Sequence, residues 1–127
     1  MPAPSPLAIA TKAVERLVKE EVFYRAELTK QDERVRTLAA EIKAAAQPSD
    51  LDPNAEYVLG QETRAADETR AIFGPLKQRT EAALANLEEQ ISLRESRIVA
   101  GTGASDDDEI EKARAVLRMG QTAVAKP

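Results

Sequence analysis

The fold is decided by residues 6–47, which read PLAIATKAVERLVKEEVFYRAELTKQDERVRTLAAEIKAAAQ. Apolar residues recur there in alternating steps of three and four, the heptad spacing of a helix that packs against other helices. No Pro or Gly interrupts residues 7–47, and Ser5 followed by Pro6 is a favourable helix start. The stretch predicts a helix over residues 6–46. Its predicted core positions are Leu7, Ala10, Val14, Leu17, Tyr24, Leu28, Val35, Leu38, Ile42 and Ala45, with Glu21 and Gln31 at two further places.

A second helical pattern follows a short break at residues 47–53. Asp52 and Pro53 repeat the signal of a cap followed by proline, and they predict a helix over residues 53–99. Because the connection is short, this helix should pack antiparallel to the first. Its predicted core positions are Val58, Ala65, Thr69, Ile72, Leu76, Ala83, Leu87, Ile91 and Ile98.

Gly74 and Pro75 lie in the middle of this second pattern. In a helix interior, proline costs about 3 kcal/mol and glycine about 1 kcal/mol. Either the helix ends near Phe73 and another begins at Pro75, or one long helix is kinked there. The helical pattern resumes without a polar loop, which favours the kink.

A third helix is predicted over residues 106–120, after the break at Gly101-Thr102-Gly103-Ala104. Ser105 can cap it, and the acidic residues 106–109 suit its positive end. The apolar face comprises Ile110, Ala113, Val116 and Leu117, and fraying is expected near Gly120. The predicted fold is all-α: an elongated three-helix bundle, spectrin-like or coiled-coil, that forms a single domain over residues 1–127.

The composition argues against an enzyme. The chain has no Cys and no His, which removes thiolate chemistry, the commonest general base and the commonest metal ligand. The adjacent carboxylates Glu20-Glu21 and Glu88-Glu89 point in different directions on a helix, and residues 106–109 lack the alternating oxygens of a calcium loop. We therefore expect no catalytic, metal-binding or cofactor-binding residues, and no cofactor.

The charge and hydropathy of the chain exclude two classes of partner from our expectations. The net charge is −4, and the chain contains no block of basic residues, so nucleic-acid binding is not expected. No apolar stretch approaches membrane-spanning length, so no membrane partner is expected either. Met1–Ala10 lacks the pattern of a signal peptide, and we expect the protein in the cytoplasm.

Surplus apolar residues lie beside the main stripe of the first helix. Val18, Val22 and Phe23, together with Leu17 and Tyr24, form a band wider than one helix seam requires. Two interpretations are open. The third helix can cover this band, or the band is an exposed face that binds a partner.

The sequence resembles the tubulin-specific chaperone A (tubulin-folding cofactor A) family. The resemblance rests on an ordered set of elements over residues 7–120, including a proline inside the second helix. In the first helix these are RLVKEEVFY at 16–24, Glu27-Leu28, Gln31-Asp32 and Val35. In the second they are Tyr57, Glu68-Thr69-Arg70, Glu81-Ala82-Ala83 and Leu87, and in the third ARAVL at 113–117.

The resemblance implies a non-catalytic three-helix chaperone. Such proteins bind β-tubulin folding intermediates, support assembly of the α/β-tubulin heterodimer with other tubulin-folding cofactors, and act in the cytoplasm, associated with the microtubule cytoskeleton. A homodimer is possible. The candidate partner-binding residues match the family pattern or lie on the wide apolar band, although Tyr24 also fits the core: Arg16, Lys19, Glu20, Phe23, Tyr24 and Arg70. The alternative is a self-associating coiled-coil scaffold or adaptor protein.

Overall fold

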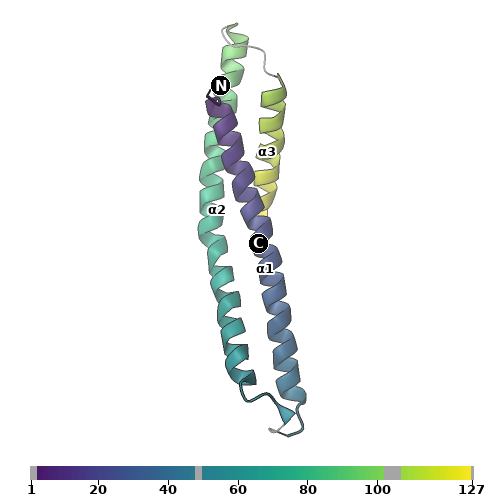
Figure 1. Cartoon of the computed structure of the whole chain (residues 1–127). Coiled ribbons are helices and arrows are strands. Elements are labelled where there is room, and N and C mark those ends of the chain that lie inside the picture. Colours follow the sequence, from purple (N-terminus) through teal and green to yellow (C-terminus); the bar gives the residue numbers. More distant parts are fainter. Residues whose placement is uncertain (1–2, 48–49, 102–106, 127) are drawn as a thin grey trace. The chain divides into compact units, whose positions relative to one another are not determined.

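The protein consists of three α-helices in the computed structural model, which describes residues 3–47, 50–101 and 107–126. Helix α1 spans Pro6–Ala44, α2 spans Ala55–Val99 and α3 spans Asp107–Ala125 (Figure 1). The described residues contain no strand. The predicted all-α helical bundle is therefore confirmed, and the first two helices have nearly the predicted bounds.

Local hydrogen bonds explain where the helices begin and end. The Ala8 N–H donates to Ser5 Oγ at 3.0 Å, so Ser5 caps α1 as predicted. At α2 the Asn54 N–H donates to Asp52 Oδ1 at 2.8 Å, and a turn over residues 53–54 delays the regular helix to Ala55. Gly101 has a φ of 72°, the left-handed conformation that commonly follows a helix end. The predicted cap at Ser105 and the acid at Asp106 lie outside the described residues.

Helix α2 continues through Gly74 and Pro75 without a break in its helical backbone. The interpretation with two separate helices is therefore wrong, while the predicted kink stays a prediction. The chain divides into two compact units, and the division falls beside Gly74. Unit 1 comprises residues 1–21 and 74–127, and unit 2 comprises Val22–Phe73. Whether both units behave as one domain also stays a prediction.

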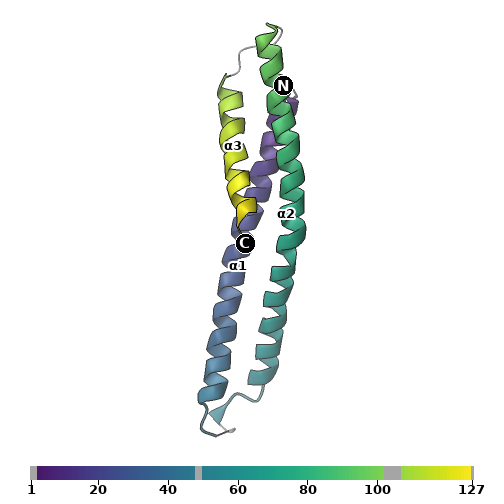
Figure 2. The same ribbon diagram turned by 180° about the vertical axis from the view of Figure 1, so that it is seen from behind.

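Unit 1 holds the hydrophobic core, which all three helices supply. Both views show α3 beside the first part of α1 and the last part of α2 (Figures 1 and 2). Leu7, Val14 and Leu87 are almost completely buried. At roughly 1.5–3 kcal/mol for each fully buried large apolar side chain, such residues stabilise the unit. The core consists of Leu7, Ala10, Val14, Leu84, Leu87, Ile91, Ile110, Ala113 and Val116.

Polar side chains also tie the three helices of unit 1 together. The Ser5 hydroxyl donates to Glu109 Oε1 of α3, and Arg94 Nη2 of α2 donates to the same oxygen at 3.1 Å. At the other end of α3, Lys126 Nζ lies 3.2 Å from Oε1 of Glu21, which is 7% exposed. The heptad position of Glu21 is therefore a core position occupied by a carboxylate with a cationic partner.

The predicted end of α3 near Gly120 is wrong, because the helix continues to Ala125. Gly120 is buried, and a Cβ atom there would lie 2.5 Å from Leu84 Cδ2 and 2.9 Å from Val14 Cγ1. The glycine thus lets α3 approach α1 and α2 closely. Beyond it, Val124 packs against the core. Tertiary packing therefore outweighs the low helix propensity of glycine.

Unit 2 contains the second part of α1, the first part of α2 and the connection between them, and the two helix segments run antiparallel. Arg34 Nε lies 3.2 Å from Glu62 Oε2, and Arg70 pairs with Asp32. Among the described residues of the unit, the buried ones are Gln31, Ala66 and Thr69, none of them a large hydrophobe. Its larger apolar seam residues are only partly buried: Leu28, Val35, Leu38, Ile42, Leu59 and Ile72. Two helices alone cannot cover both sides of such a seam.

Substitution of Gly120 tests the close approach of α3. Gly120→Val should lower the free energy of unfolding by about 1–3 kcal/mol, because the added atoms overlap Leu84 and Val14. Gly60 lies in α2, and a Cβ atom added there would have no other atom within 4 Å, so Gly60→Ala is the control. It should stabilise by about 0.4–1 kcal/mol. Urea denaturation followed by circular dichroism measures both; an unchanged midpoint for Gly120→Val would contradict the packing argument.

Substitution of Gln31 tests the polar position in the seam of unit 2. Gln31 is 7% exposed, and its Oε1 atom accepts no hydrogen bond from any described residue. Gln31→Leu should raise the free energy of unfolding by about 1–3 kcal/mol, because an unsatisfied acceptor is replaced by apolar surface. Gln78→Leu, on the exposed surface of α2, should change it by no more than about 0.5 kcal/mol. Destabilisation by Gln31→Leu would show that this amide is needed where it lies.

Candidate partner-binding surface

Three of the predicted contact residues, Arg16, Lys19 and Glu20, belong to unit 1 and lie on α1. Arg16 and Lys19 are exposed, and neither forms an ion pair with another described residue. Glu20 is partly buried, and its Oε2 atom lies 3.9 Å from Arg79 Nη2 of α2. The two cations are thus available to a partner, while Glu20 already has a loose counter-ion.

Phe23 and Tyr24 belong to unit 2 and form an aromatic pair. Their ring centroids lie 5.3 Å apart with an interplanar angle of 77°, an edge-to-face arrangement. Phe23 is 61% exposed and the neighbouring Val22 is 58% exposed, whereas Tyr24 is partly buried in the seam. Val18 is partly buried and packs against the core of unit 1. Val22 and Phe23 are therefore exposed apolar residues, whereas partner binding by this face stays a prediction.

Arg70, the sixth candidate, is held by two carboxylates within unit 2. Its guanidinium donates to Asp32 of α1, and Nη1 donates to Asp67 Oδ1 at 3.0 Å. Arg25 and Phe73 make another link between the two helices, with the guanidinium carbon 5.0 Å from the ring centroid. Sequence reasoning did not find this cation–π contact, because it depends on the register between α1 and α2. Through its contact with Asp32 of α1, Arg70 also links α1 and α2 within unit 2.

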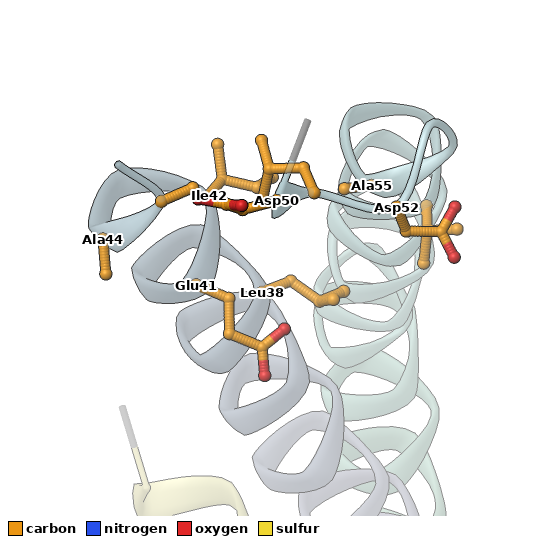
Figure 3. A pocket seen from close by; sticks show the side chains of 10 residues that line it. Leu38, Glu41, Ile42, Ala44, Asp50, Asp52 and Ala55 are labelled. Carbon is orange, nitrogen blue, oxygen red and sulfur yellow. The ribbon is translucent and has the colours of Figure 1, made fainter. Parts of the chain in front are cut away.

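A groove lies at the end of unit 2 where α1 and α2 are joined, and we call it the loop-end groove. It consists of two hollows of about 580 and 570 Å³ that share Leu38 and Val58. Figure 3 shows the first hollow, with Leu38 of α1 extending toward α2. Val58 was predicted in the core but is 39% exposed, because the described residues of unit 2 supply only two helices to the seam. The apolar walls are Leu38, Ile42, Ala45, Leu51, Ala55 and Val58.

Other kinds of site were also sought in the described part of the chain. Residues 3–47, 50–101 and 107–126 contain no cluster of three or more acidic residues placed to hold a metal ion. No helix formed by these residues is long and apolar enough to cross a membrane. The features that stand out are therefore exposed apolar side chains and the loop-end groove.

The fold and these surfaces define a helical-bundle protein with exposed aromatic and aliphatic groups on long helices. A family model described as tubulin binding cofactor A matches residues 2–117 of the 127-residue chain. The chain belongs to the tubulin binding cofactor A family, and this membership supports a role as a tubulin-binding cofactor of the chaperone type. No curated protein and no solved structure matches the chain.

Single substitutions should separate surface from structural roles in the aromatic pair. Phe23→Ala should change the free energy of unfolding by less than about 1 kcal/mol, because most of this side chain is already exposed to solvent. Tyr24→Ala should cost about 1–2 kcal/mol, because part of its ring is buried in the seam. Chemical denaturation of both variants gives the comparison. Equal losses for the two residues would contradict the assignment of Phe23 to the surface.

Proposed function

We propose that this protein captures β-tubulin folding intermediates and supports assembly of the α/β-tubulin heterodimer without catalysing a reaction. The observation that carries the proposal is the tubulin binding cofactor A match over residues 2–117. A partly folded β-tubulin exposes apolar surface that its α partner later covers. A helical face can cover this surface in the meantime and release it when a better partner arrives.

The proposed contacts include an apolar anchor in unit 2 and positively charged residues in unit 1. Phe23 and Val22 supply exposed apolar area, and aromatic residues are frequent anchors in protein interfaces. Arg16 and Lys19 supply positive charge that is not engaged within the described part of the chain. Such charges mainly raise association rates and specificity. Glu20, Tyr24 and Arg70 complete the proposed set, although their observed contacts also stabilise the helices.

A non-catalytic role agrees with the side chains that the sequence offers. The chain has neither Cys nor His, and capture by surface burial needs no proton transfer, nucleophile or cofactor. The proposed setting is the cytoplasm beside the microtubule cytoskeleton, where other tubulin-folding cofactors would receive the cargo. These partners and this setting are part of the proposal.

The alternative is a self-associating scaffold or adaptor in which two copies cover each other's exposed apolar side chains. Val22 and Phe23 favour it as much as they favour capture of a client. Sedimentation velocity separates the two functions when it is combined with a tubulin-binding assay. A tight homodimer that does not retain β-tubulin would favour the scaffold, whereas a dimer that does retain β-tubulin agrees with the chaperone.

A pull-down with purified β-tubulin tests the proposal. The wild-type protein should retain β-tubulin, and Phe23→Ala should weaken binding by about tenfold or more if this ring is an interface anchor. Ile9→Ala is a matched control, because Ile9 lies on the same helix and is 56% exposed. It should bind like the wild type.

The outcomes have separate meanings. Failure of the wild-type protein to retain β-tubulin would remove the proposed function. Normal binding by Phe23→Ala with retention by the wild type would remove only the contact assignment. Release of β-tubulin on addition of α-tubulin is expected, because heterodimer formation covers the same kind of apolar surface.

A further inference from the structure

The seam between α1 and α2 has a different environment in each unit. In unit 1, α3 lies against both helices, and Leu7, Val14 and Leu87 are almost fully buried. In unit 2, Leu38 and Ile42 are only partly buried. In a helical bundle, the apolar faces of two antiparallel helices are normally buried against a further helix. Unit 2 thus has the pattern of a helical bundle that lacks one helix.

The missing element has a definable length. Helix α3, which fills the seam of unit 1, contains 19 residues and is about 28 Å long at 1.5 Å per residue. In unit 2, α2 contributes residues 55–73, and α1 contributes residues 22–44. These segments are of comparable length to α3. One amphipathic helix of about five turns would therefore cover the seam of unit 2.

The rim of the loop-end groove specifies the charge of that helix. Its acidic residues are Glu33, Glu41, Asp50, Asp52 and Glu62, against two basic residues, Lys30 and Arg34. Arg34 is already paired with Glu62 at 3.2 Å. Four acidic residues therefore remain against Lys30 alone. A helix whose apolar stripe is flanked by Lys or Arg would complement this rim.

Charge also argues against two other elements that could cover the seam of unit 2, a second copy of this chain and helix α3. Unit 2 contains seven Lys or Arg residues and ten Asp or Glu residues, a net charge of −3. Two copies of this unit would bring like charges together, which opposes association through this seam. Helix α3 has three basic and four acidic residues, and it already packs in unit 1. A basic helix from a different protein fits better than either.

We infer that the loop-end groove and the adjoining seam of unit 2 bind a basic amphipathic α-helix of the tubulin client. This inference rests on the proposed function and extends it, because it adds a second contact region and states the chemistry of what binds there. Leu38, Ile42 and Val58 contact the apolar stripe of the client helix. The acidic rim selects for the basic residues beside that stripe.

Charge reversal of the rim tests the inference on intact tubulin. Glu33 and Glu41 are exposed, so Glu33→Lys combined with Glu41→Lys should leave the fold intact and weaken tubulin retention by about tenfold. Glu88→Lys with Glu89→Lys makes the same chemical change on an exposed part of α2 in unit 1. This control should bind like the wild type. Equal tubulin binding by the wild-type, rim and control proteins would overturn the inference and leave the proposed function standing. Failure of the wild-type protein to retain tubulin would overturn both.

A labelled groove gives a direct readout of occupancy. The chain has no Cys, so Val58→Cys provides a single site for an environment-sensitive fluorophore, and Val99→Cys, at a residue that is 89% exposed, is the control. A 19-residue peptide, matched in length to α3, with a leucine stripe flanked by Lys and Arg should shift the emission at position 58 and leave position 99 unchanged. The same peptide with Glu in place of Lys and Arg should bind at least about tenfold more weakly. Equal binding of the two peptides would overturn the charge argument.

Sedimentation velocity tests whether a second copy of this chain binds the loop-end groove instead of a client helix. In the absence of tubulin, the wild-type protein and Val58→Glu should have the same sedimentation coefficient, because the inference predicts no homodimer formed through this groove. A homodimer that dissociates on this substitution, while Ile9→Glu leaves it intact, would identify a second copy as the occupant and overturn the inference.

Discussion

The structure depends on the burial of one apolar stripe between helices that supply few large hydrophobic side chains. Two antiparallel helices leave one side of their shared stripe open, and a third helix must close it. In unit 1, α3 closes it because Gly120 lacks the Cβ atom that would overlap Leu84 and Val14. Leu87 and Ala113, in the same core, are completely buried. That close approach agrees with the continuation of α3 past Gly120 to Ala125, and it contributes to the packing of unit 1.

Polar residues at core positions differ in how their polar groups are satisfied. Thr11 and Thr80 donate their hydroxyls to the carbonyl four residues earlier, at 2.8 Å in each case, so they are buried at little cost. Glu21 has a cationic partner in Lys126, which follows α3. Gln31 lies in the seam of unit 2 with Oε1 unsatisfied among the described residues. Such groups weaken a seam but limit the registers in which helices can pair, as buried polar residues do in coiled coils.

Much of the fold could be predicted from the sequence, because heptad spacing determines which helix face is buried. It identified Leu7, Val14 and Leu87, and even the buried positions that hold Glu21 and Gln31. The end of α3 was missed, because the environment of Gly120 depends on residues far away in the sequence. At the candidate surface, surplus apolar residues on α1 pointed to Phe23. The engagement of Arg70 by Asp32 and the loop-end groove depend on the register between helices, which a single sequence does not reveal. The sequence contained one indication that part of the seam between the first two helices stays open, because the predicted third helix was far shorter than either of them.

The weakly covered seam also couples binding to stability. No large hydrophobic residue is fully buried in the part of unit 2 that the structure describes, and Leu38, Ile42 and Val58 keep contact with solvent. Regions with few buried apolar contacts open at lower free energy than the core. A partner that binds only the folded form stabilises it by RT ln(1 + [L]/Kd), which is about 2.7 kcal/mol when its concentration is 100 times Kd. In the proposed complex, any binding free energy that is used to hold the helices of unit 2 together lowers the net affinity for the client. A moderate affinity agrees with the proposed capture and later release of a tubulin client.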